Sequence, residues 1–432
     1  MFLMLFPSLC GAQGFNLSEF RLENGLDVVI NENHKAPIAK VMLFYKVGAA
    51  DELAGKSGLA HLLEHLMFRG TKSVSGEKFN TLMLENGIDF NAFTSRDLTV
   101  YHALTDIARL ELVLALEADR MANLNIDDEA FATEQKIVYQ ERQQRVENNP
   151  RARFAEEMNK IFWQNTPYEH PVSGTLAEIN AFSKEDAQKF YDMYYTPSNA
   201  VLVISGDVTK EEVQPIVQKY FGSILKNNTQ PRNLFFSMHD DGIFAASKRM
   251  QNIEKTVISV SYAVPSVFEN KKEAYALSVF SSYFGENGAN YLKKHLVDEK
   301  KVVAADSSVS ILNRGSGEFE ISVLPNDGAN IETTLHMIDE TLQNALDTLT
   351  PEMLENEKQK ILSWFVYVED NPSDAAFFIG KLKALGKNSE EIKNYSSNIG
   401  AVCLEDVRQA ITNLSHTKKM TAVLLTEKEK TE

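Results

Sequence analysis

Residues 58–71 have the sequence GLAHLLEHLMFRGT, in which His61 and His65 stand four positions apart. On an α-helix this spacing places both imidazoles on one face, about one turn apart. Imidazole is the commonest metal ligand and suits Zn²⁺, so the pair forms half of a zinc site. Glu64 lies on the same rim, where a carboxylate can take a proton from water activated by the metal. The segment therefore predicts a zinc-binding helix with hydrolytic chemistry.

The plainer interpretation of this segment is an amphipathic helix that happens to carry two histidines. Its leucines have the spacing of core residues, so the helix is expected to pack as well as to bind metal. These leucines are Leu59, Leu62, Leu63 and Leu66. A single short motif always carries a risk of coincidence, so the rest of the chain has to supply the missing ligand.

The composition describes a globular protein of more than one domain. The chain has 432 residues, of which 44% are hydrophobic and 24% charged, and that length predicts two to four domains or subdomains. The formal net charge is −16, which argues against a nucleic acid partner because binding phosphates requires a basic surface.

The N-terminus has the length and polarity of a signal peptide. Residues 1–18 contain no charge, and the apolar run of residues 1–10 is followed by Gly11 and Ala12. The run is too short to span a bilayer, so we do not expect an integral membrane protein. We predict a signal peptide in residues 1–14 and export, to the bacterial periplasm, although the run lacks a preceding Lys or Arg. The alternative is a buried N-terminal strand.

The first 104 residues carry the pattern of an antiparallel sheet around the histidine segment. Asn24-Gly25 lies between alternating apolar residues, which predicts a hairpin, and residues 40–47 predict a further strand. Residues 88–104 alternate like two paired strands around a turn at Ser95-Arg96. A strand at this place could pair with an extended peptide by β-addition. His102, within it, is interpreted as a sheet residue and not as a ligand.

Two helices follow, at residues 110–121 and 127–146, and the second carries Glu134 and Glu141 seven positions apart on one face. A catalytic zinc usually has three protein ligands, and a ligating histidine usually donates its other N–H to a nearby carboxylate. One helix could supply both carboxylates. The alternative interpretation is a solvated acidic face.

The second half of the chain repeats the first at a shift of about 220 residues. Residues 179–186 fall on 399–406, and the strand 200–205 falls on 420–425. Within ten residues of the same shift, 289–296 fall opposite the histidine segment, with Tyr291 and Lys294 in place of His61 and Glu64. The pattern predicts a duplicated fold whose second copy has lost the metal ligands. The predicted domains are residues 15–225 and 249–432, joined by a linker at 226–248.

The sequence resembles the pitrilysin/insulinase-type inverted zincins, and among them the half-length subunits that are similar to mitochondrial processing peptidase. The resemblance extends over nearly all of residues 15–430. The segments that carry it are HLLEH at 61–65, MFRGT at 67–71, NAFTS at 91–95, LEADRM at 116–121, EQKIVYQE at 134–141, PYEHPVSGT at 167–175 and YYTPSNAVLVISGD at 194–207.

The resemblance implies one zinc ion per chain, a general base and a supporting carboxylate. By residue, it implies zinc ligands His61, His65 and Glu141, the base Glu64, the support Glu134, and Asn91 and Ala92 on an edge strand beside an extended peptide substrate. The implied fold is α+β, with two homologous domains, each a mainly antiparallel sheet covered by helices, that face each other across a chamber.

The sequence departs from the family at a pair of residues that grip the substrate backbone. In the family a C-terminal half, often in a partner subunit, supplies an Arg and a Tyr seven positions apart. Val297 and Ala304 stand at the corresponding positions. We therefore predict a heterodimer with a homologous, zinc-less subunit that carries the Arg/Tyr pair; the alternative is a homodimer.

Two functions of different classes are compatible with the resemblance. The first is a zinc endopeptidase acting on unfolded peptides inside a chamber. The second is a non-catalytic structural or assembly subunit that kept the fold. We favour the peptidase because all four positions expected to hold zinc and supply the base are intact, whereas a subunit that has lost activity is expected to have lost some of them.

Overall fold

The computed structural model describes residues 14–225, 236, 238, 242–286, 288 and 290–426. The predicted signal peptide, residues 1–14, lies outside the described residues except for Gly14. Within the described ranges, no helix combines the length and the apolar composition that crossing a bilayer requires.

The first half of the chain forms a six-stranded sheet with the strand order β1-β2-β6-β3-β5-β4. Its strands are β1 Leu17–Arg21, β2 Asp27–Glu32, β3 Ile38–Tyr45, β4 Asp89–Thr94, β5 Thr99–Asp106 and β6 Ala200–Gly206. The β2–β6 pair is parallel and the other pairs are antiparallel. The predicted hairpin at Asn24-Gly25 joins β1 to β2, and Gly25 has the positive φ of 94° that favours glycine in such turns.

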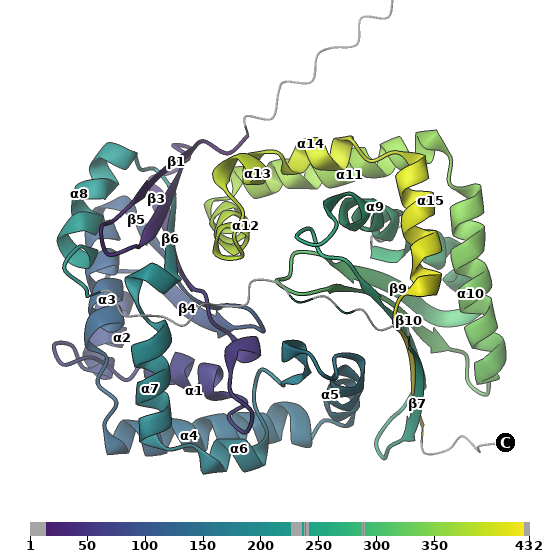
Figure 1. The fold of residues 1–432 in the computed structure, drawn as a ribbon, viewed down its shortest axis with the longest axis horizontal. Coiled ribbons are helices and arrows are strands. Elements are labelled where there is room, and N and C mark those ends of the chain that lie inside the picture. The colour runs from purple at the N-terminus through teal and green to yellow at the C-terminus, as the bar shows by residue number, and fades with distance from the viewer. Residues whose placement is uncertain are drawn as a thin grey trace, which may run out of the picture.

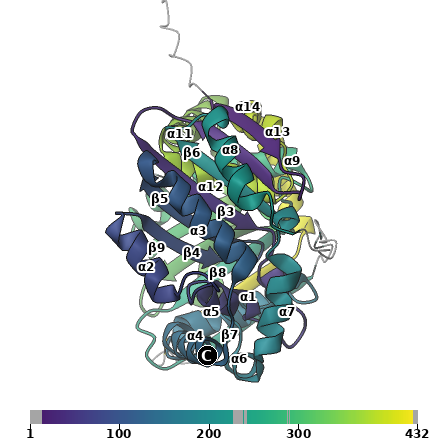
Figure 2. The ribbon, with the colours of Figure 1, turned by 90° about the vertical axis from the view of Figure 1, so that its left-hand side faces the viewer.

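The described part of the first half also contains eight helices. They are α1 Leu59–Leu66, α2 Gly76–Glu85, α3 Leu110–Asn123, α4 Asp128–Arg142, α5 Pro150–Phe162, α6 Leu176–Ala181, α7 Lys184–Tyr194 and α8 Lys210–Phe221. Apolar residues of α1, α3, α7 and α8 form one buried cluster with one face of the sheet. Figure 2 looks onto this side, where α3 and α8 lie across the strands.

The second half forms a five-stranded sheet with the order β7-β11-β8-β10-β9. Its strands are β7 Ile243–Arg249, β8 Val257–Val264, β9 Val302–Ser310, β10 Gly317–Pro325 and β11 Lys419–Leu425. Its helices are α9 Lys271–Ser281, α10 Ile331–Thr348, α11 Pro351–Asp370, α12 Pro372–Ala384, α13 Ser389–Lys393, α14 Tyr395–Gly400 and α15 Leu404–Asn413. One parallel pair, β7–β11, again accompanies antiparallel pairs. The predicted α+β class with two homologous domains is confirmed.

The two domains exchange one helix each (Figure 1). Helix α12 of the second half packs on β2, β3 and β6 of the first sheet, on the face opposite α3 and α8. Helix α5 of the first half packs on β7 and β11 of the second sheet. Both helices begin with an Asn cap followed by Pro, at Asn149-Pro150 and Asn371-Pro372. Because each sheet is covered by a helix of the other half, the halves are held together by buried apolar surface.

The close approach of α12 to the first sheet depends on a glycine. A Cβ atom on Gly380 would lie 2.0 Å from the Phe44 ring of β3. Phe44 is fully buried, so any larger residue at position 380 would force the helix away from the sheet.

The structure corrects two features of the predicted repeat. Helix α9 packs against α11 and α15 as α1 packs against α4 and α7, so α9 is the counterpart of the histidine helix. The segment around residues 290–296 lies against β9 instead, as α2 lies against β4. The pairing of Tyr291 and Lys294 with His61 and Glu64 was therefore wrong, because the loops of the two halves differ in length. Residues 243–248, assigned to the linker, belong to β7.

Candidate metal centre

The helix that carries the two histidines begins at an unusual cap. Its N-cap, Gly58, has no side chain, and the cap interactions come instead from the buried carboxylate of Glu52. Glu52 accepts hydrogen bonds from the backbone N–H groups of Gly58, at 2.9 Å, and of Ala60, at 2.7 Å. The carboxylate thus satisfies the free amides of the first turn and fixes where α1 starts.

A second glycine, Gly174, contacts the start of α1 at Gly58. Gly58 has φ of 92°, and a Cβ atom there would lie 2.7 Å from the Cα atom of Gly174. Gly174 also has positive φ and contacts the backbone of residues 57 and 58. The two backbones touch because neither residue has a side chain. Together with Glu52, this contact positions α1, whose leucines are buried and whose histidines face the opposite side.

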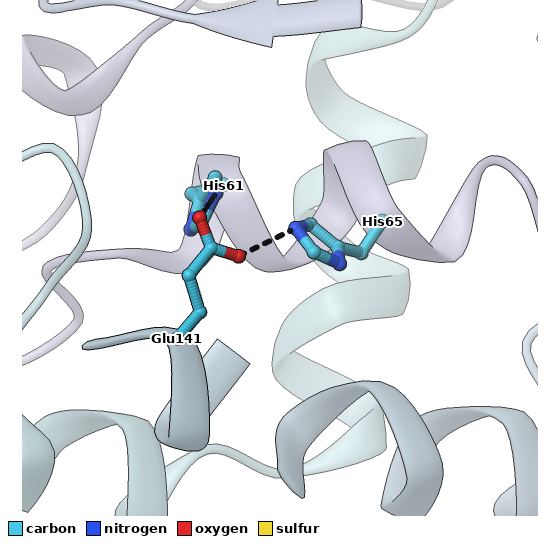
Figure 3. Close-up of side chains that lie close together, drawn as sticks. All are labelled: His61, His65 and Glu141. Atoms are coloured by element: carbon cyan, nitrogen blue, oxygen red, sulfur yellow. Dashed lines mark ion pairs between the residues drawn. The ribbon is translucent and has the colours of Figure 1, made fainter. Parts of the chain in front are cut away.

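His61, His65 and Glu141 come together as the sequence predicts (Figure 3). The Glu141 carboxylate points from α4 to the gap between the two imidazoles, with Oε1 3.8 Å from His61 Nε2 and Oε2 3.5 Å from His65 Nε2. Bonds of about 2.0–2.1 Å in tetrahedral geometry require ligand atoms about 3.3–3.5 Å apart. One ligand atom from each residue lies within 4.8 Å of the others, so side-chain movements toward a common centre would bring them to zinc distance.

Glu134 orients one of the two histidines. Its Oε2 lies 3.0 Å from His65 Nδ1, and its Oε1 accepts from the guanidinium of Arg69. With Nδ1–H donated to Glu134, the Nε2 lone pair of His65 points at the metal position. His61 has no comparable support, because its Nδ1 is buried and makes no hydrogen bond to any described residue.

The two imidazoles have opposite protonation tendencies in the metal-free protein. Burial lowers the pKa of His61 to about 4, with a further contribution from His65. Burial alone would also lower the pKa of His65, but its hydrogen bonds to Glu134 and Glu141 raise it to about 9. Hydrogen bonding from His65 in turn lowers the pKa of Glu141. The site thus holds a cation on His65 where a metal ion would otherwise supply the charge.

Glu64 lies beside this group and contacts a residue that the sequence analysis did not single out. The hydroxyl of Thr94, the last residue of β4, donates to Glu64 Oε2. Burial raises the pKa of Glu64, and the Thr94 hydrogen bond opposes that shift. One carboxylate oxygen is thus held by Thr94, which leaves the other to act on a water or a substrate.

Asn91 and Ala92 lie on β4, the edge strand of the first sheet, and line the cavity that holds the metal group. The cavity has a volume of about 740 Å³. The backbone N–H of Ala92 donates to Asn91 Oδ1 at 2.9 Å. An extended peptide that added to this edge would exchange that local bond for a ladder bond.

Arg145 is a further cavity residue that was missed. Its guanidinium lies 2.7 Å from Glu141 Oε1, and its side chain is 76% exposed. Arg145 stands four residues after Glu141, as Arg69 stands four residues after His65. An arginine four residues after a metal ligand on a helix lies on the same face as that ligand, and this spacing could have predicted both Arg69 and Arg145.

The second half has a different arrangement at the corresponding helix crossing. Ser282, which follows α9, donates to Glu357 of α11 at 3.1 Å, and both side chains are buried. In the described part of the chain, the one group of three or more His, Cys, Asp or Glu side chains that could hold a metal ion is His61, His65 and Glu141.

Comparison with known proteins places these features in a family. Residues 27–176 match the family model described as Insulinase (Peptidase family M16), and residues 181–361 match the model described as Peptidase M16 inactive domain. Zinc protease PqqE of Helicobacter pylori is 32% identical over 66% of this chain and 64% of its own length, which is just under two thirds. The beta subunit of mitochondrial-processing peptidase of Lentinula edodes is 22% identical over 90% of this chain and 85% of its own length.

A crystal structure of a protease from Helicobacter pylori superposes with a TM-score of 0.88 at 26% identity, covering 95% of this chain and 99% of that one. Its fold is therefore the same along almost the whole chain. The two matched models together extend from β2 into α11, and the chain belongs to peptidase family M16, the insulinase family.

Proposed function

We propose that this protein is a zinc-dependent endopeptidase that hydrolyses peptide bonds of unfolded peptides or small proteins. The observation that carries the proposal is the convergence of His61, His65 and Glu141 with Glu64 on one cavity wall. The family match and the relatives named as zinc proteases support the same reaction class.

The proposed roles follow from the positions of the side chains. Zinc held by His61, His65 and Glu141 would polarise the scissile carbonyl and lower the pKa of water to about 7. Glu64, with one oxygen fixed by Thr94, takes the proton of the attacking water and passes it to the leaving amine nitrogen. Glu134 keeps His65 in the ligating tautomer. An extended peptide pairs with β4 at Asn91 and Ala92, which orients its carbonyl for attack.

The second candidate is a non-catalytic structural or assembly subunit of the same fold. The family model that matches residues 181–361 is itself described as inactive, and that observation favours a non-catalytic role for the second half. The first half argues against such a role for the whole chain, because its ligand and base positions are complete.

We further propose a working heterodimer with a homologous, zinc-less subunit carrying an Arg/Tyr pair, with a homodimer as the alternative, and export to the periplasm. The support for a partner comes from Val297 and Ala304, which stand at the positions of the Arg/Tyr pair. Val297 packs against the core of the second half, and Ala304 pairs with Leu324 within the sheet, so neither serves to grip a substrate. Stoichiometric recovery of a second polypeptide that raises peptidase activity is the expected result. Full activity of the purified single chain as a monomer would contradict it.

The test of the proposed reaction compares two variants. Glu64→Gln is expected to bind one zinc per chain and to fold normally but to lose nearly all hydrolysis of a quenched fluorescent peptide, since only the proton shuttle is removed. Glu141→Gln is expected to lose zinc, because three protein ligands are the usual minimum for a catalytic site. Elemental analysis and the peptide assay measure both. Activity of Glu64→Gln within a few fold of the wild type would rule out Glu64 as the base.

A further inference from the structure

A turn of the second half reaches into the first half directly behind the metal cavity. The turn joins β9 to β10, and Arg314 at its tip is 2% exposed. The guanidinium of Arg314 pairs through Nη1 with Asp51, and its Nε lies 3.2 Å from Asp97 Oδ1. The side chains of both aspartates are about nine-tenths buried. One arginine of the second half thus bridges two carboxylates of the first.

The backbone of the same turn adds two hydrogen bonds. Arg314 N–H donates to Asp97 Oδ2 at 3.1 Å, and Gly315 N–H donates to the hydroxyl of Tyr168 at 3.1 Å. That hydroxyl donates in turn to Asp97 Oδ2 at 2.5 Å. Tyr168 lines the metal cavity and stacks against Arg96, whose guanidinium lies 5.2 Å from the ring centre. The turn therefore contacts the cavity wall through Tyr168 as well as through the two aspartates.

The two aspartates belong to segments that flank the metal group on either side. Asp51 ends the 3₁₀ turn Ala49–Asp51, and the next residue, Glu52, caps α1. Asp97 lies in the turn after β4, three residues beyond Thr94, which holds Glu64. One segment leads into the ligand helix, and the other follows the edge strand.

These two segments are also bonded to each other. Ala49 N–H donates to the Ser95 carbonyl at 3.1 Å, and Ala50 N–H donates to the Arg96 carbonyl at 2.9 Å. Gly48 allows this approach, because a Cβ atom there would lie 2.4 Å from the Ser95 carbonyl oxygen. Any displacement of one segment is therefore passed to the other, and from there to α1 and β4.

A purely stabilising role does not account for this arrangement. Replacing a buried ion pair by apolar residues of similar size is often neutral or stabilising, so a charged cluster is a weak way to hold two domains together. The domains are already joined by the exchanged helices α5 and α12. What Arg314 adds is direction, because its Nη1–H donates to Asp51 and its backbone N–H donates to Asp97 Oδ2, while the charged Nε lies 3.2 Å from Asp97 Oδ1.

We propose that Arg314 is a positioning residue of the metal centre: it holds the segment before α1 and the turn after β4 in the arrangement that peptide hydrolysis requires. The inference rests on the proposed peptidase function and gives the second half a part in it. Arg314 does not touch substrate or metal, and it acts through Asp51, Asp97 and Tyr168.

The test uses the full chain with Arg314→Met, Arg314→Lys and a control, Arg408→Met, which replaces an exposed arginine of α15 in the same half. Arg314→Met is expected to lower kcat about 10- to 100-fold with a smaller change in KM, because small displacements at a reaction centre are costly. Arg314→Lys, with one ammonium for two carboxylates, is expected to recover only part of kcat. Zinc content is expected to stay at the wild-type level, and Arg408→Met is expected to match the wild type.

Hydrogen exchange supplies a readout that does not depend on hydrolysis. Amides of residues 94–98 are expected to exchange about tenfold faster in Arg314→Met, since local opening becomes easier when the cluster is lost. If Arg314→Met does not fold, the near-isosteric Asp97→Asn takes its place, with the same expected exchange. A variant with a lower Tm but unchanged kcat and unchanged exchange at 94–98 would overturn the proposal. If the wild type hydrolyses no peptide, the proposed function fails, while the exchange result still decides the role of Arg314.

Discussion

The variant Glu134→Gln tests whether a carboxylate that does not itself bind the metal strengthens zinc binding through the ligand His65. Glu134 is 5% exposed and touches His65 through one oxygen and Arg69 through the other. Glutamine has nearly the same shape, so the helices are expected to stay in place. The amide can accept from only one of the two partners, and its NH₂ group then faces the other partner, which is itself a donor.

The expected size of the effect follows from the lost bond. A hydrogen bond to a charged group contributes about 1.5–3 kcal/mol, and loss of a carboxylate behind a ligating histidine typically weakens metal binding about 10- to 100-fold. That range corresponds to about 1.4–2.7 kcal/mol of binding free energy. The two estimates agree, so we expect the zinc Kd of Glu134→Gln to rise by one to two orders of magnitude while stoichiometry at saturating zinc is unchanged.

The measurement is competition for zinc against a chelator of known affinity, together with Tm at fixed free zinc. Because zinc stabilises only the folded state, a weaker Kd lowers the zinc-dependent gain in Tm. Glu129→Gln is the matched control, since it replaces an exposed glutamate on the same helix, α4. A Kd of Glu134→Gln within about twofold of the wild type would show that the carboxylate does not support His65.

Two further predictions concern stability. Burial lowers the pKa of His102 to about 4, below its unfolded value of about 6.5. The unfolded state therefore binds the proton first, so neutral His102 contributes fully to the free energy of unfolding above pH 6.5, and this contribution is lost as the pH falls toward 4. Allowing for partial solvent screening, we expect the wild type to lose about 1 kcal/mol of unfolding free energy between pH 6.5 and pH 5. His102→Gln is expected not to show this loss, and urea unfolding at the two pH values measures it. Gly58→Ala is expected to cost about 1–3 kcal/mol, because it adds a clash with Gly174 to an unfavourable φ of 92°. Gly55→Ala is its control, with φ of 82° and no atom within 4 Å of the added Cβ; equal losses would show that the clash contributes nothing.

The ligand group could be predicted from the sequence because its geometry is local. His61 and His65 share a face through helical periodicity alone, and Glu134 and Glu141 share a face for the same reason. One long-range assumption, that α4 crosses α1, then brings the two pairs together. Strands and helices with clear periodicity were predicted for similar reasons, including the helix at residues 110–121, which is α3 Leu110–Asn123 in the structure.

The features that were missed depend on contacts between segments far apart in the chain. Arg314 meets Asp97 across 217 positions, and no periodic pattern connects a turn of one half with a turn of the other. The packing of α5 and α12 on the sheet of the other half could not be predicted from the sequence for the same reason, although both helices begin with Asn-Pro. The repeat was misaligned because residues 289–296 were set opposite the histidine segment, whereas the order and packing of the elements place α9 there. Chemical likeness between diverged copies is a weaker guide than element order.

The lining of the metal cavity suggests what the proposed partner subunit would add, without the Arg/Tyr comparison. Every residue that lines the cavity lies between positions 61 and 173, within the first half. No described residue of the second half lines it, and by our proposal that half supports the cavity from behind through Arg314. A neighbouring cavity shares Arg96, Ala155 and Asn159 with the metal cavity, and strands β8, β10 and β11 of the second half line that neighbouring cavity. Orienting the scissile bond makes a large contribution to catalysis, so the proposed partner subunit is expected to act by adding a surface that orients the peptide.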